Sequence, residues 1–169
     1  MAEINLLEFF KTGQFGPVRI GMTRRQVKIL IGLPDNYSAP DIWEYGGVEL
    51  HFDSAKSTNP DNHQLTRITF NPIYLAAPEK WQTDISPWVF GSYFGPTRQE
   101  LKQALMQAAI SYVEAKQPSS QNQENGQNPK SNWLYNASEQ ISGTLYLSSG
   151  VSATYGTDDL IINVQLGQK

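Results

Sequence analysis

Residues 15–38, FGPVRIGMTRRQVKILIGLPDNYS, contain a pattern that the chain uses again in weaker form at residues 94–108, FGPTRQELKQALMQA. In both copies a Gly-x-Thr-Arg start precedes an apolar stripe with helical spacing. Thr23 and Thr97 therefore stand at N-cap positions, where a side-chain hydroxyl accepts a hydrogen bond from a free backbone N–H. The repeat predicts two modules that each begin with a helix.

The ends of these helices are also marked in the sequence. The first helix should end at Gly32, because glycine favours the backbone conformation that terminates a helix, and Pro34 follows. Glu100 completes a capping-box pattern for the second helix. Its apolar stripe continues through Ala108, Ala109, Tyr112 and Val113, so this helix should extend past Val113 and end before Pro118. Residues 4–10 predict a further short helix.

A hairpin follows the first helix in DIWEYGGVELHF, residues 41–52. Gly46 and Gly47 form a turn that tolerates positive φ at both positions, and this turn sets the register of the two strands. Alternation then divides the side chains between two faces of the sheet. The buried face takes Trp43, Tyr45, Val48, Leu50 and Phe52, and the outward face takes Ile42, Glu44, Glu49 and His51. A third strand, LTRITF, adds Thr66, Ile68 and Phe70 inward and Arg67 and Thr69 outward.

The second half repeats the hairpin around a turn at Ser149 and Gly150. That turn predicts that Tyr146 lies in the core and that Leu145 and Leu147 face outward, because neighbours along a strand alternate between faces. The last strand is expected to bury Leu160, Ile162, Val164 and Leu166.

Together these patterns predict an α+β fold of two tandem modules, each a helix with antiparallel strands, with the helices packed on one face of an antiparallel sheet. We expect residues 1–169 to form a single compact domain made of two pseudo-repeats, about 1–72 and 88–169, joined by 73–87. Residues 116–131 are polar and contain two prolines and a glycine, which predicts a mobile loop.

The first half resembles a known bacterial module. FGPVRIGMTRRQVKILIGLPD followed by WEYGGVELHF is similar to the helix-to-hairpin signature of the SmpA/OmlA-like small lipoproteins over residues 15–70, and the similarity is fainter over 94–166. A tandem pair of such modules resembles beta-lactamase inhibitory protein in architecture. The resemblance implies helices on one sheet face and a second face that is free for a partner. Those lipoproteins carry an acylated Cys and the inhibitor carries disulfides, whereas this chain has no cysteine.

The composition excludes several classes of function. A net charge of −3 provides no basic surface for nucleic acid or for an anionic membrane. The absence of cysteine excludes thiol nucleophiles, disulfides and cysteine-ligated zinc. The N-terminal residues lack a basic start and a long apolar run, which predicts a cytoplasmic chain without a signal peptide. We expect no cofactor, and the sequence specifies no catalytic constellation of Ser, His and acid.

One strand raises the question of a metal site. Glu49, His51 and Asp53 lie at alternate positions, and three such side chains can hold a divalent cation. A solvated strand face is the favoured alternative, because alternation produces polar triplets on half-buried strands. We therefore expect no metal site. Glu44 opposite Glu49 brings like charges together, which Arg67 on the neighbouring strand can offset.

The outward sheet face is the candidate functional surface, because aliphatic side chains on an otherwise polar face indicate contact with another molecule. The sequence predicts a non-catalytic protein-binding module of the inhibitor, immunity or adaptor type, which binds another protein or itself. The alternative is a small-ligand-binding protein or an enzyme with a pocket between the sheet and the helices. The predicted contact residues are Ile42, Glu44, Glu49, His51, Arg67, Leu145 and Leu147.

Overall fold

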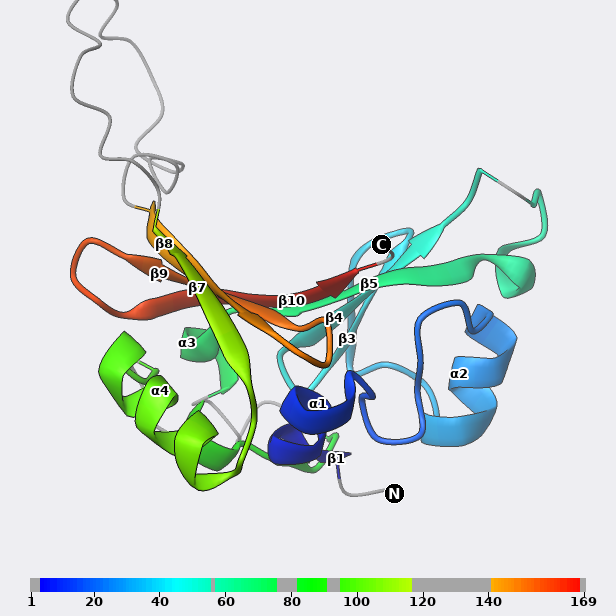
Figure 1. The fold of residues 1–169 in the computed structure, drawn as a ribbon. Coiled ribbons are helices and arrows are strands. Elements are labelled where there is room, and N and C mark those ends of the chain that lie inside the picture. The colour runs from blue at the N-terminus through cyan, green and yellow to red at the C-terminus, as the bar shows by residue number, and fades with distance from the viewer. Residues whose placement is uncertain (1–3, 56, 76–81, 91–94, 117–140, 168–169) are drawn as a thin grey trace, which may run out of the picture.

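Eight strands form one antiparallel sheet, and helices lie against one of its faces (Figure 1). The computed structural model describes residues 4–55, 57–75, 82–90, 95–116 and 141–167. The strand order is β2-β3-β4-β5-β10-β9-β8-β7. These strands are β2 (Asn36–Ala39), β3 (Ile42–Tyr45), β4 (Val48–Asp53), β5 (Gln64–Phe70), β7 (Tyr112–Lys116), β8 (Ile141–Leu147), β9 (Ser152–Gly156) and β10 (Ile161–Gly167). A separate parallel pair consists of β1 (Ile4–Asn5) and β6 (Ile85–Ser86).

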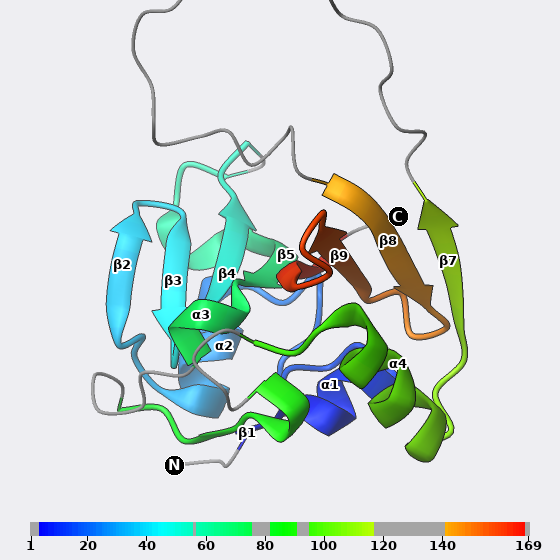
Figure 2. The ribbon, with the colours of Figure 1, turned by 90° about the vertical axis from the view of Figure 1, so that its left-hand side faces the viewer.

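The helices gather on one side of the sheet. Two views show α1, α2 and α4 on the same side, with α1 between the other two (Figures 1 and 2). The predicted α+β class is therefore confirmed. The α-helices are α1 (Leu6–Thr12), α2 (Arg24–Ile31), α3 (Pro72–Leu75) and α4 (Arg98–Gln107), and short 3-10 turns cover Pro60–Asn62 and Trp88–Phe90.

The two halves of the chain follow the same order of elements. The first half supplies α2 and then β2 to β5, and the second supplies α4 and then β7 to β10. The last strand of each half lies at the centre of the sheet, where Val164 of β10 pairs with Phe70 of β5. The predicted origin of this order in two tandem modules stays a prediction.

Apolar side chains fill the space between the sheet and the helices. The fully buried Phe9 and Phe10 of α1 lie at its centre. The ring of Phe9 lies 6.3 Å from that of Phe70 on β5, and the ring of Phe10 lies 5.2 Å from that of Phe90. The hydroxyl of Ser149, in the second half, donates a hydrogen bond of 2.7 Å to the carbonyl of Phe10. Helix α1 therefore holds both halves together.

The helices begin where the sequence predicts. Thr23 accepts a hydrogen bond of 3.3 Å from the N–H of Gln26, and Thr97 accepts one of 3.2 Å from the N–H of Glu100. In both cases the third helical residue accepts a bond from the N-cap N–H in return, which completes a capping box. Gly32 ends α2, as predicted.

The predicted end of the second helix is wrong. Helix α4 ends at Gln107, and Ala109 adopts a left-handed φ of 55°, which stops the helical path. The chain then enters β7 at Tyr112. The apolar residues that continue the helical spacing over 108–113 therefore belong to two elements. Ala108 caps α4, and Tyr112 and Val113 begin β7. The short helix predicted over 4–10 is present as α1, which Asn5 caps.

The first hairpin has the predicted register. Gly46 and Gly47 take φ values of 57° and 83°. In the two strands that flank this turn, Glu44 pairs with Glu49 and Ile42 pairs with His51. The whole predicted inward set of this hairpin is buried, namely Trp43, Tyr45, Val48, Leu50 and Phe52. In the third strand Leu65 is buried in place of the predicted Thr66, because the pairing shifts between His51 and Phe52.

The register predicted for the second hairpin is wrong by one residue. The N–H of Leu147 donates a hydrogen bond of 2.9 Å to the carbonyl of Val151, so residues 148–150 together form the turn. Leu145 and Leu147 are consequently buried, with 0% and 6% exposure, while Tyr146 is 53% exposed. Gly150 takes a φ of 90°, which suits a longer turn that closes on a glycine.

Two further predictions concern the second half. In the last strand Val164 and Leu166 are buried as predicted, but Ile161 is buried in place of its neighbours because the pairing shifts between Ile161 and Asn163. The predicted mobile loop 116–131 lies outside the described residues from 117 onward, and Lys116 belongs to β7.

Candidate functional site

The sheet face opposite the helices, here called the open face, carries its side chains in continuous rows. Directly paired residues of antiparallel strands share a face, so the register defines each row. The middle row crosses all eight strands. At about 4.8 Å per strand it is about 33 Å long. From β2 to β7 the row is Asn36, Glu44, Glu49, Thr69, Gln165, Ser152, Tyr146 and Val113.

The first-half end of the open face is charged. Nη2 of Arg67 donates a hydrogen bond of 3.1 Å to Nδ1 of His51. Nε2 of His51 lies 3.0 Å from Oε2 of Glu49, but the two groups are not aligned for a hydrogen bond, and Nε2 has no bonding partner. Burial, together with the charge of Arg67, lowers the pKa of His51 to about 4, so this ring is neutral at neutral pH. Burial raises the pKa of Glu49, which the charge of Arg67 opposes.

Glu44 lies opposite Glu49, as the sequence predicts, but in different surroundings. Nδ2 of Asn36 donates a hydrogen bond of 3.0 Å to Glu44, and the hydroxyl of Ser38 donates another. The carboxylate of Glu44 is therefore bound by the edge strand β2. Arg67, the predicted offset for the pair of like charges, acts on Glu49.

The second-half end of the open face is neutral. Tyr146 and Val113 are paired across β8 and β7 and are 53% and 71% exposed. Beside them the hydroxyls of Thr144 and Thr154 lie 3.3 Å apart. Hydroxyl groups and exposed apolar surface thus stand at one end of the face, and charges stand at the other.

Most of the predicted contact residues lie on the open face. Leu145 and Leu147 do not, because they belong to the core. In the part of the chain that the structure describes, the large apolar side chains exposed on this face are Tyr146 and Val113, which the sequence reasoning missed. The sequence did contain a signal for the exposure of Tyr146. Ser148, Ser149 and Gly150 fit a three-residue hairpin turn that ends on glycine, and a turn of this length places Tyr146 on the outward face. The predicted residues that do lie on the open face are Ile42, Glu44, Glu49, His51 and Arg67.

A small hollow lies in the open face where β4, β5 and β10 meet. Its volume is about 110 Å³. The hydroxyl of Thr69 donates a hydrogen bond of 3.0 Å to Oδ1 of Asn163, and the carboxylate of Glu49 stands beside this pair. Glu49, Thr69 and Asn163 therefore contribute side-chain oxygens to a wall that also contains the apolar Phe70. Its lining residues are Gly47, Glu49, Thr69, Phe70, Asn71 and Asn163.

On the helix side, Arg24 forms a buried cluster at the start of α2. Its guanidinium lies 5.2 Å from the centre of the Phe52 ring and is paired with Asp41. Asp41 also contacts Nδ1 of His63 at 3.1 Å, while Nε2 of His63 lies 2.9 Å from the carbonyl oxygen of Ser57. His63 is therefore buried and anchors its loop. Because Ser57 offers its carbonyl and not its hydroxyl, the His and Asp pair activates no nucleophile there.

Arg98 forms a comparable cluster at the start of α4. Its guanidinium lies 5.0 Å from the centre of the Tyr155 ring and is paired with Glu114 at 3.2 Å and Asp159 at 2.9 Å. Glu114 also accepts a hydrogen bond of 2.8 Å from the hydroxyl of Tyr155. Each polar group binds another group of the protein, so the cluster joins α4 to the sheet.

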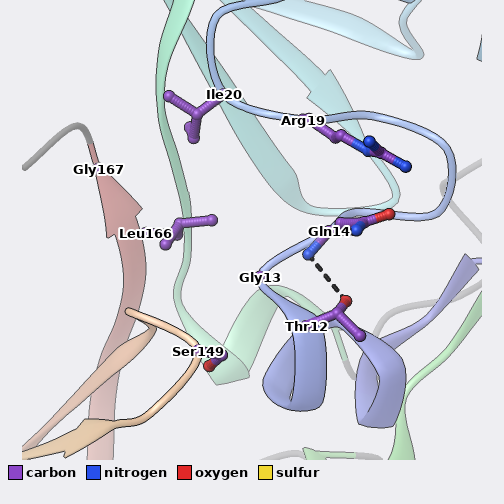
Figure 3. A pocket seen from close by; sticks show the side chains of 8 residues that line it. All are labelled: Thr12, Gly13, Gln14, Arg19, Ile20, Ser149, Leu166 and Gly167. Atoms are coloured by element: carbon purple, nitrogen blue, oxygen red, sulfur yellow. Dashed lines mark hydrogen bonds between the residues drawn. The ribbon is translucent and has the colours of Figure 1, made fainter.

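A larger hollow opens beside the end of α1 (Figure 3). Its volume is about 490 Å³. Ile20 and Leu166 lie on one side of it, and Arg19 and Gln14 lie on the other (Figure 3). Arg19 is exposed. This groove offers one cation and apolar contacts. Its lining residues are Thr12, Gly13, Gln14, Arg19, Ile20, Ser149, Leu166 and Gly167.

No protein-family model, curated protein or solved structure matches this chain. The resemblance to the SmpA/OmlA-like module and to beta-lactamase inhibitory protein therefore stays a prediction. Among the described residues, no group of three His, Cys, Asp or Glu side chains is arranged to hold a metal ion. In the same part of the chain, every helix is too short or too polar to cross a membrane.

Proposed function

We propose that this chain is a non-catalytic recognition module that binds another protein, or a second copy of itself, through the open face. The observation that carries the proposal is the unbroken row across the sheet, charged at Glu49 and ending in the exposed pair Tyr146 and Val113. Aromatic side chains surrounded by polar groups are typical of protein interfaces.

The size of the open face supports this role. The middle row is about 33 Å long, and the strands have up to seven residues at about 3.4 Å each. The face therefore offers on the order of 800 Å², which is about the area that each partner buries in an interface of standard size. The apolar filling between the sheet and α1 leaves the outer surfaces as the places for a partner.

We also propose that the two halves are tandem copies of one module, so that each copy contributes one end of the open face. Equivalent contacts support this view. Arg24 covers the ring of Phe52 at 5.2 Å, and Arg98 covers the ring of Tyr155 at 5.0 Å. In each half the N-cap threonine also forms a bridge to the region where the last strand starts.

The test uses a photo-crosslinking amino acid at Gln165, in the middle of the open face, and at Arg25, on the exposed side of α2. In the native cell, the Gln165 position should crosslink to one protein that the Arg25 position does not capture. That protein is then purified, and its affinity for the chain is measured by calorimetry.

A pair of tyrosine variants provides the control. Tyr146→Ser should weaken the complex at least about tenfold, because exposed interface tyrosines often contribute more than about 1.4 kcal/mol to binding. Tyr37→Ser should leave the affinity unchanged, since Tyr37 is 56% exposed but pairs with Trp43 and so shares its face. Equal affinities for both variants would contradict the proposal. If the captured protein is the chain itself, sedimentation of both variants gives the same comparison.

The alternative function is binding of a small ligand. The groove beside α1 favours it, because Arg19, Gln14 and the hydroxyl of Thr12 lie next to the apolar Ile20 and Leu166 (Figure 3). This combination suits a small molecule with an anionic group and an apolar part. Some polar groups of the groove are already bonded within the chain, since Thr12 accepts a hydrogen bond of 3.1 Å from the N–H of Gln14.

A further inference from the structure

The hollow in the open face contains the carboxylate of Glu49. Glu49 is 36% exposed, and within the described residues no Lys or Arg forms an ion pair with it. The nearest basic group on the face, Arg67, directs Nη2 to Nδ1 of His51 at 3.1 Å. His51 is neutral and is not aligned to donate to Glu49. The charge of Arg67 acts on Glu49 without forming an ion pair with it. A half-buried carboxylate without a directly paired cation is costly, so a cation from outside would be bound favourably.

The remaining groups of the hollow complement such a cation. Because the hydroxyl of Thr69 donates its proton to Asn163, its oxygen still offers lone pairs as an acceptor. The Oδ1 atom of Asn163 has a second lone pair as well. An ammonium or guanidinium group has several N–H donors and no acceptor, which fits the side-chain oxygens of Glu49, Thr69 and Asn163. A single carboxylate is a poor ligand set for a divalent metal ion by comparison.

We infer that the hollow receives the end of a Lys or Arg side chain of the protein partner, with the Glu49 carboxylate as its ion-pair acceptor and with Thr69 and Asn163 as further acceptors. This inference rests on the proposed function of the open face. Glu44 is not a second site of this kind, although it lies opposite on the neighbouring strand. Its carboxylate already accepts bonds from Asn36 and Ser38.

The test selects random peptides displayed on phage against the immobilised chain. Peptides that bind the wild-type chain should be enriched in Lys or Arg at one position. Glu49→Gln should weaken the binding of a selected peptide at least about tenfold, because it removes one partner of a desolvated charge pair. Replacing the critical Arg of the peptide by citrulline, or the critical Lys by norleucine, should cause a similar loss.

Glu8→Gln is the charge-matched control, because it removes one negative charge from the exposed side of α1, away from the open face (Figure 1). The control should change the affinity less than about twofold. If basic peptides were bound only by a general attraction to an acidic protein, the affinity would fall by a similar factor in the control and in Glu49→Gln. Free methylguanidinium or butylamine tests whether the cation alone suffices. Shifts of the Asn163 side-chain signals at millimolar concentrations, absent in Glu49→Gln, would support the same site with a low-affinity free ligand.

The outcomes separate the two proposals. If selected peptides lose affinity in Tyr146→Ser but bind Glu49→Gln as tightly as the wild-type chain, the cation site is wrong and the open face remains the binding surface. If no selected peptide responds to Tyr146→Ser or to Glu49→Gln, or if none is selected, both proposals are wrong. Thermal unfolding of Glu49→Gln checks its fold, and the peptide substitutions keep the test decisive if that variant is unstable.

Discussion

Leu147 and Tyr146 are neighbours in the chain but lie in opposite environments. Leu147 is 6% exposed and packs in the core, while Tyr146 is 53% exposed on the open face. The turn at 148–150 decides this, because its length fixes which residue of β8 faces Val151. One residue more or less in the turn would exchange the two environments, since side chains alternate along a strand.

Aspartate substitutions at these two positions should therefore have different effects on stability. Leu147→Asp should lower the free energy of unfolding by about 3 kcal/mol or more, because it removes a buried side chain and buries an unpaired charge. Tyr146→Asp should lower it by less than about 1 kcal/mol, as is usual at the surface. Urea unfolding followed by fluorescence measures both, and comparable losses would contradict the register.

At the scale of elements, helix α4 and the edge strand β7 are joined by one acidic side chain. Glu114 of β7 forms ion pairs with Lys102 at 2.9 Å and with Arg98 at 3.2 Å. Hydrogen bonds from Lys102 and Tyr155, followed by the nearby positive charges, lower the pKa of Glu114 from 4.5 to about 2 against the opposing effect of burial. The ion pairs between β7 and α4 therefore depend on an ionised carboxylate, whereas the backbone pairing of β7 with β8 does not.

This depressed pKa predicts acid sensitivity. The stabilisation from Glu114 is fully present above about pH 4.5. It is lost as the pH falls towards about 2, where the carboxylate of Glu114 becomes protonated in the folded protein as well. Glu114→Gln should lower the free energy of unfolding at neutral pH by on the order of 2 kcal/mol and flatten its decline in this range.

Urea titrations from neutral pH to about pH 2 measure this effect. Glu8→Gln is the control, because Glu8 pairs with Lys11 at 3.4 Å on the exposed side of α1. Its removal should change the free energy of unfolding by less than about 1 kcal/mol. A pH dependence of Glu114→Gln that matches the wild-type chain would show that this carboxylate does not stabilise the contact between β7 and α4.

At the scale of the whole molecule, the two halves share one sheet and one core. Strands β5 and β10 pair at its centre, from Val164 with Phe70 to Gly167 with Arg67. Helix α1, from the first half, contacts Ser149 in the second through the carbonyl of Phe10. Separation of the halves would expose two long strand edges and the aromatic side chains of α1.

We therefore predict that the halves do not fold alone. Fragments 1–78 and 79–169 should each lack a cooperative thermal transition and should regain one when mixed. The intact chain should unfold in one step with equal calorimetric and van't Hoff enthalpies, as expected for a two-state domain. A cooperative transition of either fragment alone, or two transitions of the intact chain, would contradict a shared core.

The first half was largely predictable because its signals are local. The turn at Gly46 and Gly47 allows one register, and the alternation on both sides of it agrees with that register. The open-face residues Glu44, Glu49 and His51 follow directly from it. In the second half the turn at Ser149 and Gly150 allowed two registers, and the residues on both sides did not decide between them.

The sequence by itself determined the helix starts at Thr23 and Thr97, the first hairpin and the α+β class, because caps, glycine turns and alternation act within a few residues. Only the tertiary structure decided the register of the second hairpin, the end of α4 and the pairing of β5 with β10. It also decided that Arg24 and Arg98 bind aromatic rings and that no Lys or Arg among the described residues forms an ion pair with Glu49. These features depend on contacts between segments far apart in the chain, whose free energies outweigh local preferences only once the core has formed.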